Sequence, residues 1–61
     1  MPFITIKVLE GKTEEQKREM ISQMTNMISE TWGIPKEVIF IFFEDLKKGD
    51  YGKHGKLYSD L

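Results

Sequence analysis

The residue with the clearest chemical potential is Pro2, which follows Met1 directly. Removal of Met1 would leave the proline with a free secondary amine, and such an amine acts as a base or as a nucleophile. An α-amino group titrates near ~7.7–8.0, and burial or a nearby cation lowers its pKa, which frees the base at neutral pH. Because many chains begin with Met-Pro without any such role, the rest of the sequence has to support this prediction.

The composition argues against several other kinds of site. The 61 residues include no cysteine and one histidine, His54, so thiolate metal sites are excluded and zinc is disfavoured. A net charge of −1 provides no excess of positive charge for binding nucleic acid or an acidic membrane. No apolar run approaches the ~18 residues of a membrane span, and no signal peptide is visible, so we expect a cytoplasmic protein. A solvated face, rather than a phosphate site, is expected for Lys47, Lys48, Lys53 and Lys56.

The length predicts one domain spanning residues 1–61. A chain of this size buries only about 60% of its unfolded surface, and its core rarely supplies more than about 3–5 kcal/mol. Small domains usually add disulfides, a metal or partner subunits. Because disulfides and a metal are disfavoured here, association with partner subunits is the remaining way to stabilise this chain.

Two elements would hold the amino terminus in place. Residues 3–9 alternate apolar and polar side chains, as a strand does. Thr13 and Gln16 have the spacing of a capping box, and Gly33 followed by Pro35 predicts the end of a helix of about 20 residues. One face of this helix carries an apolar stripe, which we expect to be core rather than a binding surface: Met20, Ile21, Met24, Met27, Ile28, Thr31 and Trp32. Lys17 lies at the start of the stripe and is expected to snorkel, with its ammonium in water.

Residues 38–43 are apolar at every position, which is typical of a buried parallel strand. Strand, helix and strand form a βαβ unit, and residues 51–58, with two glycines, suit a small hairpin whose turn exposes His54. The fold class is therefore α/β (α+β). Because one helix covers only one face of a two-stranded sheet, the sheet is expected to be completed by oligomerisation.

The order of these features resembles the 4-oxalocrotonate tautomerase family, small tautomerases with an amino-terminal proline. The similarity is carried by residues 1–7, by 9–13 and 15–17, and by Lys48-Gly49-Asp50-Tyr51-Gly52. It covers nearly the whole chain without gaps. The resemblance implies a homohexamer, a trimer of dimers, without metal or organic cofactor. It also implies an isomerase that interconverts enol and keto forms of unsaturated 2-oxo acids.

By position, the resemblance makes Pro2 the general base. Lys12 stands where the family has an arginine that handles the substrate's carboxylate or carbonyl, and Tyr51 stands where an aromatic residue lines the pocket. Phe40 replaces the family's second substrate-binding arginine. Since phenylalanine cannot bind a carboxylate, an aryl or alkyl enol acid is the expected substrate rather than a dicarboxylate.

Geometry places this site at a subunit boundary. Pro2 and Lys12 flank the strand 3–9 at opposite ends, which are roughly 23 Å apart at ~3.3 Å per residue. Lys12 of a two-fold partner with an antiparallel strand could reach Pro2.

Two other kinds of protein remain open from the sequence. One is a non-catalytic oligomeric module that binds small acids or another protein. The other is a structural subunit paired with a second, arginine-bearing chain in a mixed oligomer. Retention of Met1 would favour the former, because Pro2 would then carry no free amine.

Overall fold

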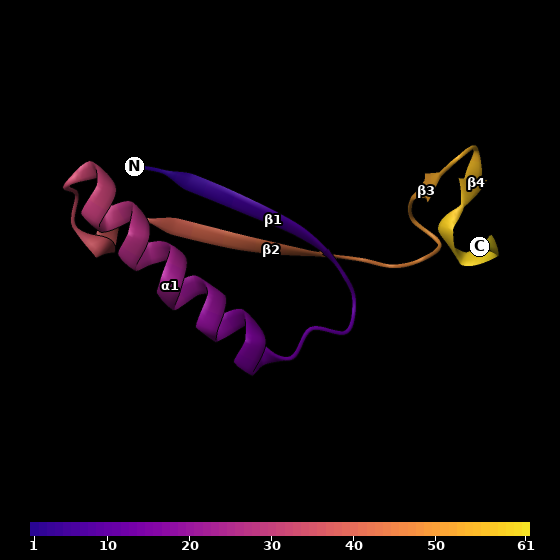
Figure 1. Cartoon of the computed structure of the whole chain (residues 1–61), viewed down its shortest axis with the longest axis horizontal. Helices are drawn as coiled ribbons and strands as arrows, with labels where there is room; N and C mark the ends of the chain where they lie inside the picture. The colour runs from indigo at the N-terminus through magenta and orange to yellow at the C-terminus, as the bar shows by residue number, and fades with distance from the viewer.

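Residues 1–61 are all described by the computed structural model, in which a βαβ unit is followed by a separate small hairpin (Figure 1). The βαβ unit consists of β1 (Phe3–Leu9), α1 (Glu14–Trp32) and β2 (Phe40–Leu46). The hairpin pairs β3 (Gly52–Lys53) with β4 (Lys56–Leu57) in antiparallel fashion. This architecture is the predicted α/β (α+β) fold.

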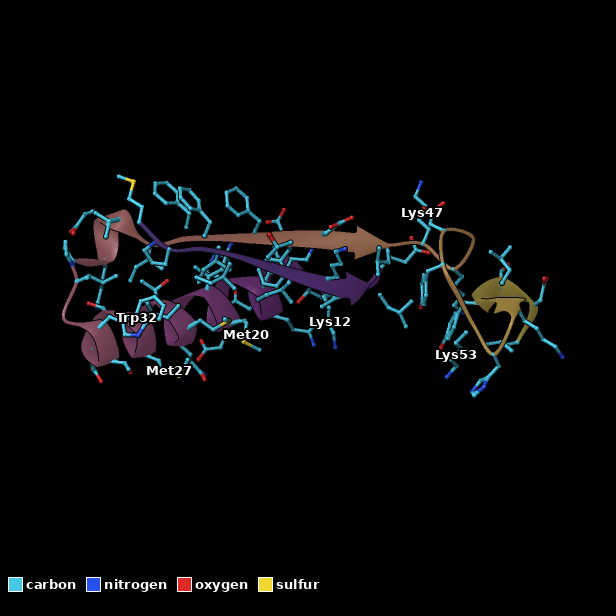
Figure 2. All side chains as sticks on the ribbon, turned by 90° about the horizontal axis from the view of Figure 1, so that it is seen from above. Lys12, Met20, Met27, Trp32, Lys47 and Lys53 are labelled. Atoms are coloured by element: carbon cyan, nitrogen blue, oxygen red, sulfur yellow. The ribbon has the colours of Figure 1, made fainter.

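The two long strands are parallel and in register from Phe3 opposite Phe40 to Leu9 opposite Leu46. Alternation along β1 and β2 sends Ile4, Ile6 and Phe43 toward α1, where they are partly buried. Figure 2 shows α1 along one face of this sheet and ring side chains projecting from the opposite face. The strand predicted for residues 3–9 is confirmed.

The ends of α1 follow from local sequence. The Thr13 hydroxyl accepts a hydrogen bond from the Gln16 N–H at 3.1 Å, and the Gln16 side chain accepts one from the Thr13 N–H at 2.9 Å. This reciprocal capping box satisfies two of the free donors of the first turn. At the other end Gly33 is left-handed, with φ 64° and ψ 38°, as the sequence predicted.

The bounds of the second strand were predicted wrongly, as 38–43. Lys36–Val38 form a short 3₁₀ turn after Pro35, closed by the Ile39 N–H donating to the Lys36 carbonyl at 3.1 Å. The strand therefore begins at Phe40. It continues through the polar Glu44 and Asp45 because β1 offers paired positions as far as Leu9. Tertiary pairing thus overrides the low strand propensity of acidic residues.

The expectation that the helical stripe is core holds only in part. Ile28 is the single residue of the chain that is buried, at 8% exposure, and Met24 is partly buried. Met20, Met27 and Trp32 are exposed, and Figure 2 labels them along α1. A two-stranded sheet is too narrow to cover the whole stripe, so the side chains on its flank remain open.

One chain leaves much apolar surface uncovered. Its radius of gyration is 14.9 Å, whereas a compact domain of this length has about 10.5 Å. Its accessible area is 4887 Å², against about 4,100 Å² for a folded monomer of its 7.2 kDa mass. The surplus is close to the ~800 Å² that each partner buries in a standard interface.

The hairpin is organised by its turn. His54 and Gly55 have φ values of 54° and 75°, the two consecutive left-handed residues of a type I′ turn. The hairpin predicted for residues 51–58, with His54 in its turn, is confirmed. None of the helices combines the length and the apolar composition that a membrane span requires.

Gly52 is the hairpin position least tolerant of a side chain. A Cβ there would lie 2.1 Å from the Lys56 carbonyl oxygen, so Gly52→Ala should weaken the hairpin by about 1–3 kcal/mol. The measurement is hydrogen exchange of the Tyr58 amide, which donates to the Tyr51 carbonyl at 2.8 Å. Gly49→Ala is the control, since no atom beyond its two chain neighbours lies within 4 Å of its new Cβ. Equal protection in both variants would contradict this account.

Candidate active site

Pro2 lies at the amino-terminal edge of the sheet, immediately before β1. Its carbonyl accepts a hydrogen bond from the Phe40 N–H at 3.1 Å, which continues the β1–β2 ladder by one step. The proline itself is partly buried. The backbone next to the candidate base is therefore held by the sheet, as positioning a reactive group requires.

Phe40 belongs to an aromatic cluster at this same end of the sheet. Its ring stacks on Phe3 with centroids 5.2 Å apart, and Phe42 lies 6.5 Å from Phe3. All three rings are on the face that α1 does not cover, and their exposures are 64% for Phe3, 40% for Phe40 and 50% for Phe42. The structure thus brings Pro2 and Phe40 together and surrounds that end of the sheet with apolar surface.

Lys12 lies at the other end of β1, in the connection to α1 (Figure 2). The seven residues of β1 separate it from Pro2 by roughly 23 Å. Lys12 forms no ion pair. It borders a hollow of about 160 Å³ between the sheet and the start of α1, lined by Ile6, Val8, Lys12, Gln16, Lys17, Met20 and Phe43.

Lys17 is a second cation of this hollow, and its partner was not foreseen. Its ammonium lies 2.9 Å from the Asp45 carboxylate and 5.6 Å from the centre of the Phe43 ring. A lysine within an apolar stripe is a visible signal in the sequence. Nothing in the sequence pairs it with Asp45, however, because the two residues are 28 positions apart and Asp45 lies outside the strand predicted for residues 38–43.

Tyr51 lies before β3, outside the βαβ unit. Its ring stacks on Tyr58 with centroids 5.0 Å apart, and the Lys53 ammonium lies over the Tyr58 ring, 5.7 Å from its centre. Loss of solvent, and secondarily the neighbouring Tyr58, raise the pKa of Tyr51 above its usual 10. The phenol is therefore neutral at pH 7 and available as a hydrogen-bond donor.

One chain does not assemble all four predicted residues. Pro2 and Phe40 adjoin, whereas Lys12 lies beyond the far end of β1 and Tyr51 beyond the far end of β2 (Figure 1). No three His, Cys, Asp or Glu side chains gather where they could hold a metal ion. The four predicted residues thus offer a proline that follows Met1, one unpaired ammonium, an aromatic ring and a phenol.

Comparison with known proteins shows the family to which the chain belongs. The family model described as tautomerase enzyme matches residues 2–61. A probable tautomerase of Bacillus cereus is 47% identical over 60 residues, which are 98% of each chain. A protein of Bacillus subtilis named 2-hydroxymuconate tautomerase is 43% identical over 61 residues, covering 100% of this chain and 98% of its own.

Comparison of the structure with solved structures points to the same family. A crystal structure of a homologue of 4-oxalocrotonate tautomerase superposes with a TM-score of 0.89 at 42% identity, over 98% of both chains. The chain belongs to the tautomerase enzyme family, and the predicted resemblance is confirmed.

Proposed function

We propose that this protein is a keto–enol tautomerase acting on unsaturated 2-oxo acids, with the amine of Pro2 as general base once Met1 is removed. The observation that carries the proposal is the placement of Pro2. Within a chain that belongs to the tautomerase family, it lies partly buried at a sheet edge, with its carbonyl hydrogen-bonded to the Phe40 N–H. A base needs such a fixed position and a poorly hydrated neighbourhood.

In this mechanism the Pro2 amine removes the hydroxyl proton of the enol acid or, in the reverse direction, a proton from the carbon next to the carbonyl. The electron pair moves onto the oxygen and along the conjugated system as a dienolate. The proline then returns the proton at another position of that system. Lys12 stabilises the developing negative charge, and removing one such donor typically costs about 10²–10³ in rate. The proposed reaction needs no metal or organic cofactor.

Lys12 serves this reaction from a second copy of the chain. The length of β1 keeps Lys12 away from the Pro2 of its own chain, whereas a two-fold partner with antiparallel strands brings its Lys12 to that Pro2. The uncovered face with Phe3, Phe40 and Phe42 and the surplus accessible area support association of several copies. We therefore propose a homo-oligomer with shared sites, and a hexamer built as a trimer of dimers as its form.

Phe40 narrows the proposed substrate class. At the Pro2 end of the sheet, the Phe40 ring offers stacking surface and no cation for a second carboxylate. An enol acid with one carboxylate, bound by Lys12, and an aryl or alkyl tail is the substrate that these groups favour. Tyr51 closes the pocket in this proposal and supplies a neutral phenol.

The test compares an aryl enolpyruvate with 2-hydroxymuconate, using protein whose mass shows that Met1 is absent. We expect higher kcat/KM on the aryl acid. Phe40→Arg should shift the ratio of the two kcat/KM values toward the dicarboxylate by about tenfold, because a charged hydrogen bond replaces a stacking surface.

Phe42→Arg is the matched control, since it places the same charge two residues further along the same exposed face. It should leave the ratio unchanged. An equal shift in both variants would remove Phe40 from the substrate site. Absence of activity on both acids in correctly processed oligomer would favour a binding or structural role instead.

A further inference from the structure

The ion pair between Lys17 and Asp45 is the only one that links two elements of the fold. It joins α1 to β2 with 2.9 Å between the ammonium nitrogen and the carboxylate oxygen, while the other ion pairs, those of Arg18, stay within α1. The Lys17 side chain is 24% exposed and the Asp45 side chain 45%. The pair is thus partly withdrawn from water, beside the Phe43 ring.

Stability alone does not account for a lysine at this position. Taking an ammonium and a carboxylate partly out of water costs free energy that their attraction offsets only with good geometry, and a well-packed apolar pair is often as stable. The Lys17 position faces apolar side chains, Ile6 and Phe43 among them, against which a methionine would pack. A directional bond between α1 and β2 fixes the position of one element relative to the other, which an apolar contact does not.

The segment between β1 and α1 is what this bond holds in place. At its beginning, the Glu10 N–H donates to the Leu46 carbonyl at 3.0 Å. At its end, the first turn of α1 is tied to Asp45 through Lys17. Asp45 and Leu46, which are adjacent in β2, therefore bind the two ends of the connection that carries Lys12.

The pair also distributes charge within the hollow. Lys12 and Lys17 both line it, and Asp45 neutralises Lys17 alone. Lys12 is left as the ammonium of this hollow without a carboxylate partner. An anionic substrate group is thereby directed to Lys12 rather than shared between two cations.

We infer that the Lys17–Asp45 pair is a positioning device that holds the Lys12 connection in place and directs the substrate's carboxylate to Lys12. The second part rests on the proposed function; the first concerns the fold alone. Neither Lys17 nor Asp45 is a catalytic residue in this inference, because both act through Lys12.

The test uses Asp45→Asn and Lys17→Met, which keep side-chain size while removing one charge each. With the aryl enol acid, both should raise KM about tenfold and change kcat less, since displacements of about 1 Å in a binding group cost up to about 100-fold. Lys17→Arg should restore much of the loss, because it retains the charge. Arg18→Met is the matched control: it removes a cation from the next residue of the same helix, and it should leave KM unchanged.

A second measurement does not depend on activity. Hydrogen exchange of the Glu10 and Thr13 amides should accelerate in Asp45→Asn and not in Arg18→Met. If the unaltered protein proves inactive while this acceleration occurs, the proposed function fails and the positioning of the connection stands. The inference is overturned if Asp45→Asn and Arg18→Met give the same exchange rates at the Glu10 and Thr13 amides and, in an active enzyme, the same KM.

Discussion

Replacing Pro2 by alanine is expected to lower kcat/KM by at least about 100-fold, in line with the 10²–10⁴ that a positioned general base contributes. Alanine keeps a free amino terminus but loses the ring that fixes the nitrogen's direction. An uncleaved amino-terminal tag should be more damaging, because it converts the Pro2 nitrogen into an amide that cannot accept a proton. Steady-state kinetics on the aryl enol acid measure both effects.

The pH profile checks the same assignment. A protonated amine is no base, so kcat/KM should fall as pH drops through the pKa of the Pro2 amine. In the proposed shared site the Lys12 ammonium of a second copy faces this amine and disfavours its protonated form, so Lys12→Ala should move the midpoint of the profile upward. A tagged protein with full activity would rule out Pro2 as the base.

Mixing two inactive variants should restore activity. In Pro2→Ala every site lacks its base, and in Lys12→Ala every site lacks its cation, with losses of about 10² or more in each. If a site takes Pro2 from one chain and Lys12 from another, refolding an equimolar mixture creates intact sites in about one quarter of positions, by random assortment around the symmetry axis. Activity should then rise from nearly none to about a quarter of that of the unaltered protein.

The controls for this experiment are each variant refolded alone and the two mixed without refolding. Neither should gain activity, because chains of the two variants do not enter the same assembly. Sedimentation should show assemblies of the same size throughout. Failure of the refolded mixture to exceed its components, with assembly intact, would place Pro2 and Lys12 of the same chain in one site and contradict the shared arrangement.

Local signals were sufficient for much of the fold. The alternation in residues 3–9 predicted β1, the Thr13–Gln16 spacing predicted the capping box, and Gly33 predicted the end of α1. Each of these depends on residues within a few positions of one another. Such patterns act through steric preference and short-range hydrogen bonds, so no knowledge of the remaining chain was needed.

The bounds of β2 needed the partner strand. Residues 38 and 39 are apolar and yet lie outside β2, while Glu44 and Asp45 are acidic and lie within it. Strand pairing supplies hydrogen bonds to any residue that lies opposite an available strand, whatever its side chain. The sequence therefore located this strand but misplaced both of its ends.

For the candidate site, the sequence by itself determined which side chains are available: the Pro2 ring, whose nitrogen becomes an amine once Met1 is removed, the Lys12 ammonium, and the rings of Phe40 and Tyr51. It also determined, through the length of β1, that Pro2 and Lys12 of one chain lie far apart. Only the tertiary structure decided that Lys17 pairs with Asp45 and that Phe40 adjoins Pro2. These contacts join positions 28 and 38 residues apart, and such neighbours depend on how the strands align rather than on any local pattern.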